Sequence, residues 1–315
     1  QEDARRVFLA VAGDRHAADP RLDLLVSAVD RLPLALTLLA HRAETDPDLS
    51  AVCSEWQEQG PAAASRGQGR LDDLTRSLEL SIHGPRMRAC PAAARLLSLL
   101  GFLPDGIAWD DLEPLLPEVS GDAARALRQV GLAFDEDRML RVLAPIREHA
   151  RRRSPLGREE EARVLPLYLT RAAKLGEKVG AEGGAAASAR LTAEARNIES
   201  VIERVLTQGR HAEAVDALCG FAEFARFSGY RGRVMDLLTE AATKSPVPFD
   251  RARYLECLGD IALARSDHAE ARARFDAALP LFQQVGSLLG QANCIRSVGD
   301  IAVRGSGSIA PWPFA

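Results

Sequence analysis

The hexapeptide Leu-Gly-Asp-Ile-Ala-Leu at residues 258–263 returns at residues 298–303 as Val-Gly-Asp-Ile-Ala-Val. Around the first copy, apolar residues recur every three or four positions, the spacing that places side chains on one face of a helix. Polar residues 266–268 interrupt this pattern, and a second helical pattern then runs to Phe282. A two-helix unit that recurs after forty residues predicts a stack of helical repeats, an architecture suited to binding a partner.

Gly259 and its counterpart Gly299 lie inside these predicted helices, where glycine costs about 1 kcal/mol relative to alanine. We therefore expect a close approach of the partner helix at this position. The pattern resembles the tetratricopeptide family, whose repeat carries a large residue, a Leu-Gly pair, and later Ala, Phe and Ala. The residues that match this pattern, and that we expect to pack the repeats, are Leu255, Leu258, Gly259, Ala271, Phe275, Ala278 and Gly299.

The second copy of the repeat is incomplete. Its helical pattern covers residues 291–304 and is followed by a Gly-Ser run rather than by a second helix. The period of forty exceeds the usual period of about 34 in this family, which predicts longer helices or a longer loop at residues 285–287. We expect residues 305–315 to be a flexible tail and the array to have continued in a longer parent protein.

The composition describes an ordinary globular protein. The chain of 315 residues is 27% charged and 47% hydrophobic and carries a formal charge of −4, which gives no overall attraction to nucleic acid or anionic membranes. Five dispersed cysteines form no CxxC pair, and no apolar run is long enough to span a membrane. We expect a cytoplasmic protein of two or three domains without a membrane partner.

The rest of the chain is predicted to be mainly α-helical. Residues 1–60 indicate a helical subdomain, in which Pro33 begins a helix that is nearly apolar all round as far as residue 40. A loop at residues 61–69 precedes residues 70–153, where three helices are followed by a β-hairpin at the acidic turn Asp135-Glu136-Asp137. This succession resembles a winged-helix domain. Residues 158–245 are predicted as a helical, repeat-like region, and residues 250–304 as the tetratricopeptide repeats.

Three motifs, in order, resemble a family of regulatory ATPases. Residues 29–36 read Val-Asp-Arg-Leu-Pro-Leu-Ala-Leu and resemble the Gly-Leu-Pro-Leu-Ala motif of NB-ARC ATPases, which belong to the STAND class of signal-transduction ATPases. In that family the motif lies in a helical lid subdomain, and a winged helix follows. Residues 191–199 then resemble the Glu-x-x-Asn-Leu helix that precedes the repeats in bacterial members. An ordinary helix with a partly buried Asn197 explains the third motif equally well.

The resemblance implies a regulatory switch. The lid and winged helix would close over ADP or ATP bound to a separate core, a partner on the repeats would shift the balance between closed and open states, and oligomerisation on activation is possible. By resemblance, Pro33 and, beside it, Leu32 would contact the nucleotide. Residues 142–144, where relatives carry Met-His-Asp, are Val-Leu-Ala. We expect no phosphate sensing there, and we expect His149 to be a surface residue.

No catalytic or metal site is predicted. The sequence contains no Gly-x-x-x-x-Gly-Lys-Ser/Thr loop, so these residues cannot hydrolyse ATP by themselves and are not expected to hold a cofactor. The six histidines are scattered singly, with no HExxH motif. The acidic residues 159–161 are expected to form a solvated helix face.

Two other functions remain open on the sequence alone. The chain could be an independent scaffold that binds a helix or peptide through its repeats and never meets nucleotide. Alternatively, the winged helix could bind DNA through Arg125 and Arg128 on its third helix. DNA is the less favoured partner, because Asp122 begins that helix and the tip of the wing is acidic, which would repel phosphate.

Overall fold

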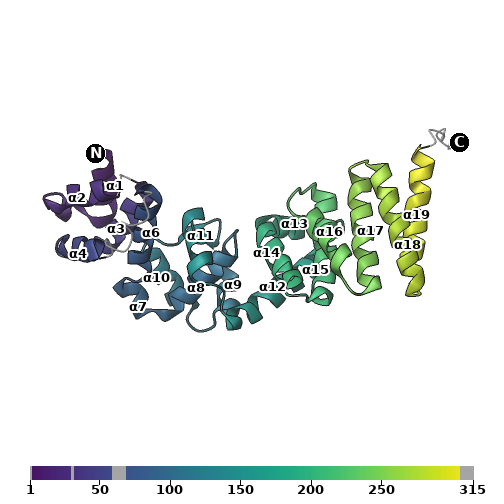
Figure 1. Ribbon diagram of the computed structural model, residues 1–315, viewed down its shortest axis with the longest axis horizontal. Helices are drawn as coiled ribbons and strands as arrows, with labels where there is room; N and C mark the ends of the chain where they lie inside the picture. Colours follow the sequence, from purple (N-terminus) through teal and green to yellow (C-terminus); the bar gives the residue numbers. More distant parts are fainter. Residues whose placement is uncertain (1, 30–31, 59–68, 306–315) are drawn as a thin grey trace. The chain divides into compact units, whose positions relative to one another are not determined.

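The computed structural model describes residues 2–29, 32–58 and 69–305 (Figure 1). The described chain is mainly α-helical with one small antiparallel sheet, as predicted. It forms two compact units, Gln1–Glu161 and Ala162–Ala315. Most of the expected loop at residues 61–69 and most of the expected tail at 305–315 lie outside the described residues.

The first unit begins with a cluster of helices around a buried one. The bounds are α1 Glu2–Ala12, a 3-10 turn Asp14–His16, α2 Arg21–Ala28, α3 Pro33–Ala43, α4 Ser50–Glu58 and α6 Gly69–Ile82. Helix α3 begins at Pro33, whose fixed φ suits the first helical position. Its side chains Ala35, Leu36, Leu39 and Ala40 are buried in a core shared with α1, α2 and α4. This burial explains why the first turns of α3 are almost entirely apolar.

The same unit continues with the arrangement of a winged helix. The bounds are α7 Pro85–Ala89, α8 Pro91–Phe102, β1 Ile107–Ala108, α9 Trp109–Leu115, α10 Ser120–Gln129, β2 Phe134–Glu136, β3 Met139–Arg141 and α11 Ala144–Arg153. The strands pair antiparallel in the order β1-β3-β2, with Leu140 between Ile107 and Asp135. Asp137 and Arg138 both have positive φ, as a tight two-residue hairpin turn requires. The hairpin was predicted, whereas β1 was not.

Two residues of this unit are less exposed than the sequence predicts. The His149 side chain is only 8% exposed, with Nε2 3.2 Å from a carboxylate oxygen of Glu79, and is not a surface group. Glu160 is also not on a solvated face, because its side chain is 7% exposed and its Oε1 accepts a hydrogen bond of 2.5 Å from Nε of Arg95. Both side chains are covered through partners 65 or more residues away in the chain.

The second unit consists of helices joined mostly by short turns. The bounds are α12 Arg158–Gly176, α13 Gly184–Ala193, α14 Ala195–Thr207, α15 His211–Ser228, α16 Val234–Lys244, α17 Pro248–Ala264, α18 His268–Gln284 and α19 Leu288–Gly305. Helices α17 and α18 have 17 residues each, and only residues 285–287 separate α18 from α19. The long period of the repeat therefore comes from longer helices and not from a longer loop.

Glu194 and Asn197 anchor the start of α14. The Glu194 side chain is fully buried, and its Oε1 lies 2.9 Å from Nη1 of Arg171 and 2.8 Å from Nη2 of Arg190. Asn197 is also fully buried and donates from Nδ2 to the hydroxyl of Tyr168 at 3.2 Å. These contacts tie α12, α13 and α14 together, so the Glu-x-x-Asn pattern has a structural role whether or not the family resemblance holds.

Glycines allow the helices of the second unit to approach closely. A Cβ placed on Gly176 would lie 2.3 Å from the Cα of Gly220, so the backbones of α12 and α15 touch there. A Cβ on Gly259 of α17 would lie 2.7 Å from Cε1 of Phe275 on α18. A Cβ on Gly290 of α19 would lie 2.5 Å from Cδ1 of Phe282. Two rings of α18, seven residues apart, thus each rest on a glycine of a flanking helix.

Most of the predicted repeat-packing residues surround these contacts. Leu258, Ala271, Phe275 and Ala278 are 0–1% exposed, and Leu255 is partly buried against the core formed by Ala252, Ala262 and Phe282. Gly299 differs from its counterpart Gly259, because it is exposed and a Cβ there would have no neighbour within 4 Å among the described residues. The described part of the chain offers no helix to cover that position.

Candidate partner-binding face

Leu32 and Pro33 lie at the start of α3. Leu32 is half-buried against the core of the helical subdomain, and its carbonyl accepts a hydrogen bond of 2.9 Å from the amide of Leu36. The Pro33 ring is exposed. Residues 30 and 31, which complete the motif on its amino-terminal side, lie outside the described residues. The contacts of Leu32 and Pro33 account for the beginning of a helix, and Pro33 stays accessible from solvent.

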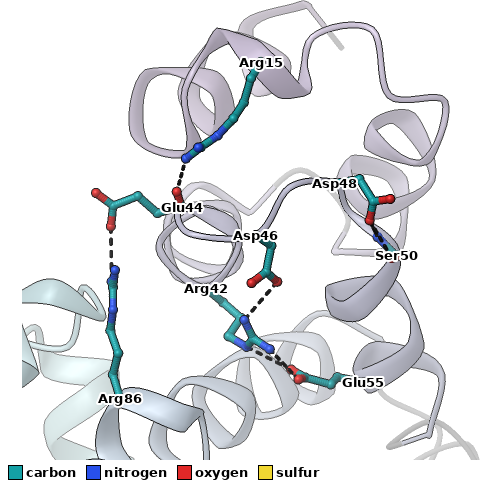
Figure 2. Close-up of polar contacts among 8 residues, drawn as sticks. All are labelled: Arg15, Arg42, Glu44, Asp46, Asp48, Ser50, Glu55 and Arg86. Carbon is teal, nitrogen blue, oxygen red and sulfur yellow. Dashed lines mark hydrogen bonds and ion pairs between the residues drawn. The ribbon is translucent and has the colours of Figure 1, made fainter.

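At its other end, α3 carries a network of charged side chains (Figure 2). Arg42, only 12% exposed, donates to Asp46 at 3.0 Å and to both oxygens of Glu55. Beside it, Glu44 pairs at 3.2 Å with Arg86 of α7, and Arg86 also donates to the carbonyl of Gln129 at 3.0 Å. Arg86 therefore joins the helical subdomain to the winged helix.

A small pocket opens at this joint. Its lining includes His41, Gly84, Arg86 and Val130. Burial lowers the pKa of His41, so its imidazole is neutral at physiological pH. Gly131 lies so close that a Cβ there would be 2.4 Å from Cδ2 of His41. The helices at this joint are therefore closely packed. His41 and Arg86 are among the polar side chains that line the pocket beside it.

The candidate DNA-contacting arginines are already paired. Nη1 of Arg125 is 3.1 Å from Asp122, and Nη1 of Arg128 is 2.5 Å from Asp135, with its guanidinium also over the ring of Trp109. Each phosphate contact needs a positive charge that can release a counterion. Both arginines of α10 would first have to leave a carboxylate, so the geometry does not favour this helix as a DNA-reading element.

The most distinctive polar surface lies on α15, α17 and α19. We call it the charged face and define it by Asp216, Cys219, Glu223 and Arg226 of α15, Arg253, Glu256, Cys257 and Asp260 of α17, and Asn293 and Arg296 of α19. Nη1 of Arg253 is 2.6 Å from Asp216, and Nδ2 of Asn293 donates to Glu256 at 3.0 Å. These two contacts fix the three helices side by side.

A pocket opens on the α15 side of the charged face. It is open to solvent, and its lining includes Gly176, Asp216, Gly220, Glu223 and Arg253. Gly176 and Gly220, whose backbones are in close contact, both line it and contribute no side chain to the space. Carboxylates and one guanidinium therefore line this pocket together with two glycines.

Asp260 lies at the centre of the charged face without a hydrogen bond or ion pair of its own in the described chain. Burial and the neighbouring carboxylates of Glu256 and Glu223 raise the pKa of Asp260 to about 6, while the more distant Arg226 and Arg296 oppose the shift. Its carboxylate makes no hydrogen bond or ion pair within residues 69–305. Burial raises the pKa of Glu256 as well. Two partly desolvated carboxylates therefore lie together with only an amide in direct contact, which favours a cationic ligand.

The repeat was predicted from the sequence, whereas the charged face was not. Asp216, Cys219, Glu223 and Arg226 recur at intervals of three and four, as do Arg253, Glu256 and Asp260. This periodicity of polar residues opposite an apolar stripe could have indicated one face of each helix. The periodicity could not indicate which helices lie side by side in the fold.

No group of histidine, cysteine, aspartate or glutamate in the described ranges has the arrangement of a metal site. Over the same ranges, no helix is both long enough and apolar enough to cross a bilayer. Comparisons with protein-family models, with curated proteins and with solved structures gave no match for this chain.

Proposed function

We propose that this chain is the regulatory portion of a STAND-type switch, with a helical lid subdomain, a winged helix and a partner-sensing repeat arm. The order of these parts supports the proposal, and so does the bridge that Arg86 makes from Glu44 to Gln129, since a switch needs a joint that can open. Residues 1–315 contain no phosphate-binding loop, so the nucleotide core of such a switch is not among them. The proposed compartment is the cytoplasm.

The observation that carries the proposed partner binding is Asp260, a half-buried carboxylate without a direct partner in the described chain. We propose that the charged face binds a protein segment that brings an Arg or Lys side chain to Asp260 and Glu256. A cation there would gain a charge-assisted hydrogen bond in a partly desolvated site, where such contacts are strongest. The neighbouring pocket beside Gly220 would accept the adjoining residue of the segment.

Selection of peptides from a random displayed library on the full chain tests this proposal. We expect the recovered sequences to be enriched in Arg and Lys, and we expect addition of 0.5 M NaCl to weaken their binding. Recovery of purely apolar sequences, or of none, would contradict it.

The alternative function, a scaffold without nucleotide, is favoured by the missing phosphate-binding loop. Sequencing the gene upstream of the Gln1 codon distinguishes the two. An in-frame Gly-x-x-x-x-Gly-Lys-Ser/Thr motif, with ADP binding by calorimetry when that region is joined to this chain, is expected for the switch. If the motif is absent, or if ADP does not bind, the result supports the scaffold and contradicts the switch.

A further inference from the structure

Two cysteine thiols meet where α15 packs against α17. Nη1 of Arg253 on α17 is 2.6 Å from a carboxylate oxygen of Asp216 on α15. Cys219 lies about one helical turn beyond Asp216, and Cys257 lies about one turn beyond Arg253. The thiol of Cys257 donates a hydrogen bond to the sulfur of Cys219. Two of the five cysteines are therefore brought into contact by the packing of two helices that are distant in sequence.

The surroundings of this pair favour a reaction that begins at Cys219. Cys219 lines the open pocket on the α15 side of the charged face, and both thiols are only half-buried, so a small molecule can reach them. Burial lowers the pKa of Arg253, but the neighbouring Cys219 and Asp216 together raise it above its ordinary value, so a guanidinium charge lies beside the sulfur. Cations beside a thiol assist its reaction with peroxides, because the reacting form is the thiolate. Cys294 on α19, by contrast, is buried, and burial raises its pKa to about 12.

We propose that Cys219 and Cys257 form a site of reversible oxidation by hydrogen peroxide, which closes a disulfide between α15 and α17. The sulfur of Cys219 attacks one peroxide oxygen, the O–O bond breaks, and a sulfenic acid and one water form. The sulfur of Cys257 then displaces the sulfenic oxygen as a second water, so two thiols and one peroxide give one disulfide and two waters. A dithiol reductant reverses the reaction. In a reducing compartment such a disulfide is transient and responds to the level of oxidant.

The test is oxidation of the full chain with hydrogen peroxide, followed by alkylation of the remaining thiols, digestion with trypsin without reductant, and mass spectrometry. Trypsin places Cys219 in residues 211–226, Cys257 in residues 254–265 and Cys294 in residues 275–296. We expect the first two peptides to be joined with the loss of two hydrogens. Two of the five thiols should be lost, and dithiothreitol should restore both.

Three variants test the order of the two steps. Cys257→Ser should leave Cys219 as a sulfenic acid that dimedone traps. Cys219→Ser should leave Cys257 unmodified, because its hydrogen bond to Cys219 and its burial raise the pKa of Cys257. Cys90→Ser is the matched control, since Cys90 caps the start of α8, where serine is a favoured residue, and this variant should form the disulfide normally.

Several results would overturn the proposal. These are the absence of a disulfide after oxidation, a disulfide that joins Cys257 to Cys294, and disulfides between two chains on a non-reducing gel. Oxidation of the urea-unfolded chain should give mixed pairings. If it gives the disulfide between Cys219 and Cys257 as readily as the folded chain does, the fold does not bring the thiols together. The reaction needs no partner protein, so its outcome is separate from that of the peptide selection.

Discussion

The ring of Phe275 rests on the backbone of Gly259, where a Cβ would lie 2.7 Å from the ring carbon Cε1. This contact joins the two helices of the complete repeat, and Phe275 is 1% exposed. The same glycine in the second copy, Gly299, has no neighbour within 4 Å in the described chain. The same repeat position is therefore packed against an aromatic ring at Gly259 and has no neighbour in the described chain at Gly299.

The two glycines should respond differently to alanine. Both substitutions gain about 1 kcal/mol of helix propensity, but Gly259→Ala also forces a buried ring to shift, which costs roughly 1–3 kcal/mol. We expect Gly259→Ala to be less favourable than Gly299→Ala by about 1–3 kcal/mol, measured by urea unfolding of the full chain. If the two substitutions change the free energy of unfolding equally, the close approach at Gly259 does not affect stability.

Asp260 makes stability depend on pH. Its pKa is about 6 in the folded protein and near the ordinary value of 3.8 when unfolded. Between these values the folded state binds more protons, so stability falls as pH rises, and the penalty is complete above about pH 6. Asp260→Asn should therefore raise the free energy of unfolding at pH 8 by about 1–3 kcal/mol and have little effect near pH 4.

The control for this measurement is Asp276→Asn on α18, whose side chain is 55% exposed and 3.5 Å from Arg272. Its effect on unfolding should be small at both pH values, since exposed ion pairs contribute under about 1 kcal/mol. A pH-independent effect of Asp260→Asn would refute the raised pKa.

The ion pairs of Glu194 with Arg171 and Arg190 should contribute to the stability of the protein. Arg171→Met should lower the free energy of unfolding by about 1–3 kcal/mol, because Arg190 still pairs with the carboxylate. The double change Arg171→Met and Arg190→Met removes two cations from a fully buried carboxylate and should cost about 3–5 kcal/mol. Arg210→Met, which breaks an exposed pair with Glu213, is the control and should change stability by less than about 1 kcal/mol. A double change that costs less than about 1 kcal/mol would indicate that Glu194 reaches water.

Much of the fold follows from local patterns. The spacing of Leu255, Leu258 and Ala262 predicts the repeat helix, and the acidic turn at Asp135 predicts the hairpin. The strand β1 has only two residues, too few to show any alternation, and it exists because Ile107 pairs with Leu140 of the hairpin.

The polar side chains show the limit of prediction from sequence. Glu160 and His149 look exposed in their own helices and are covered only by packing against α8 and α6, which carry their partners Arg95 and Glu79. Likewise, Asp260 is one acid among many in the sequence. Its raised pKa arises because α15 and α19 flank α17 and limit its contact with water.

The charged face is the centre of the proposed function, and the affinity of one library-selected peptide for three proteins tests it most directly. Calorimetric titration would compare the unchanged chain with Asp260→Asn and with the control Asp276→Asn. The account predicts at least tenfold weaker binding to Asp260→Asn and unchanged binding to Asp276→Asn. Equal affinity for all three proteins would contradict it.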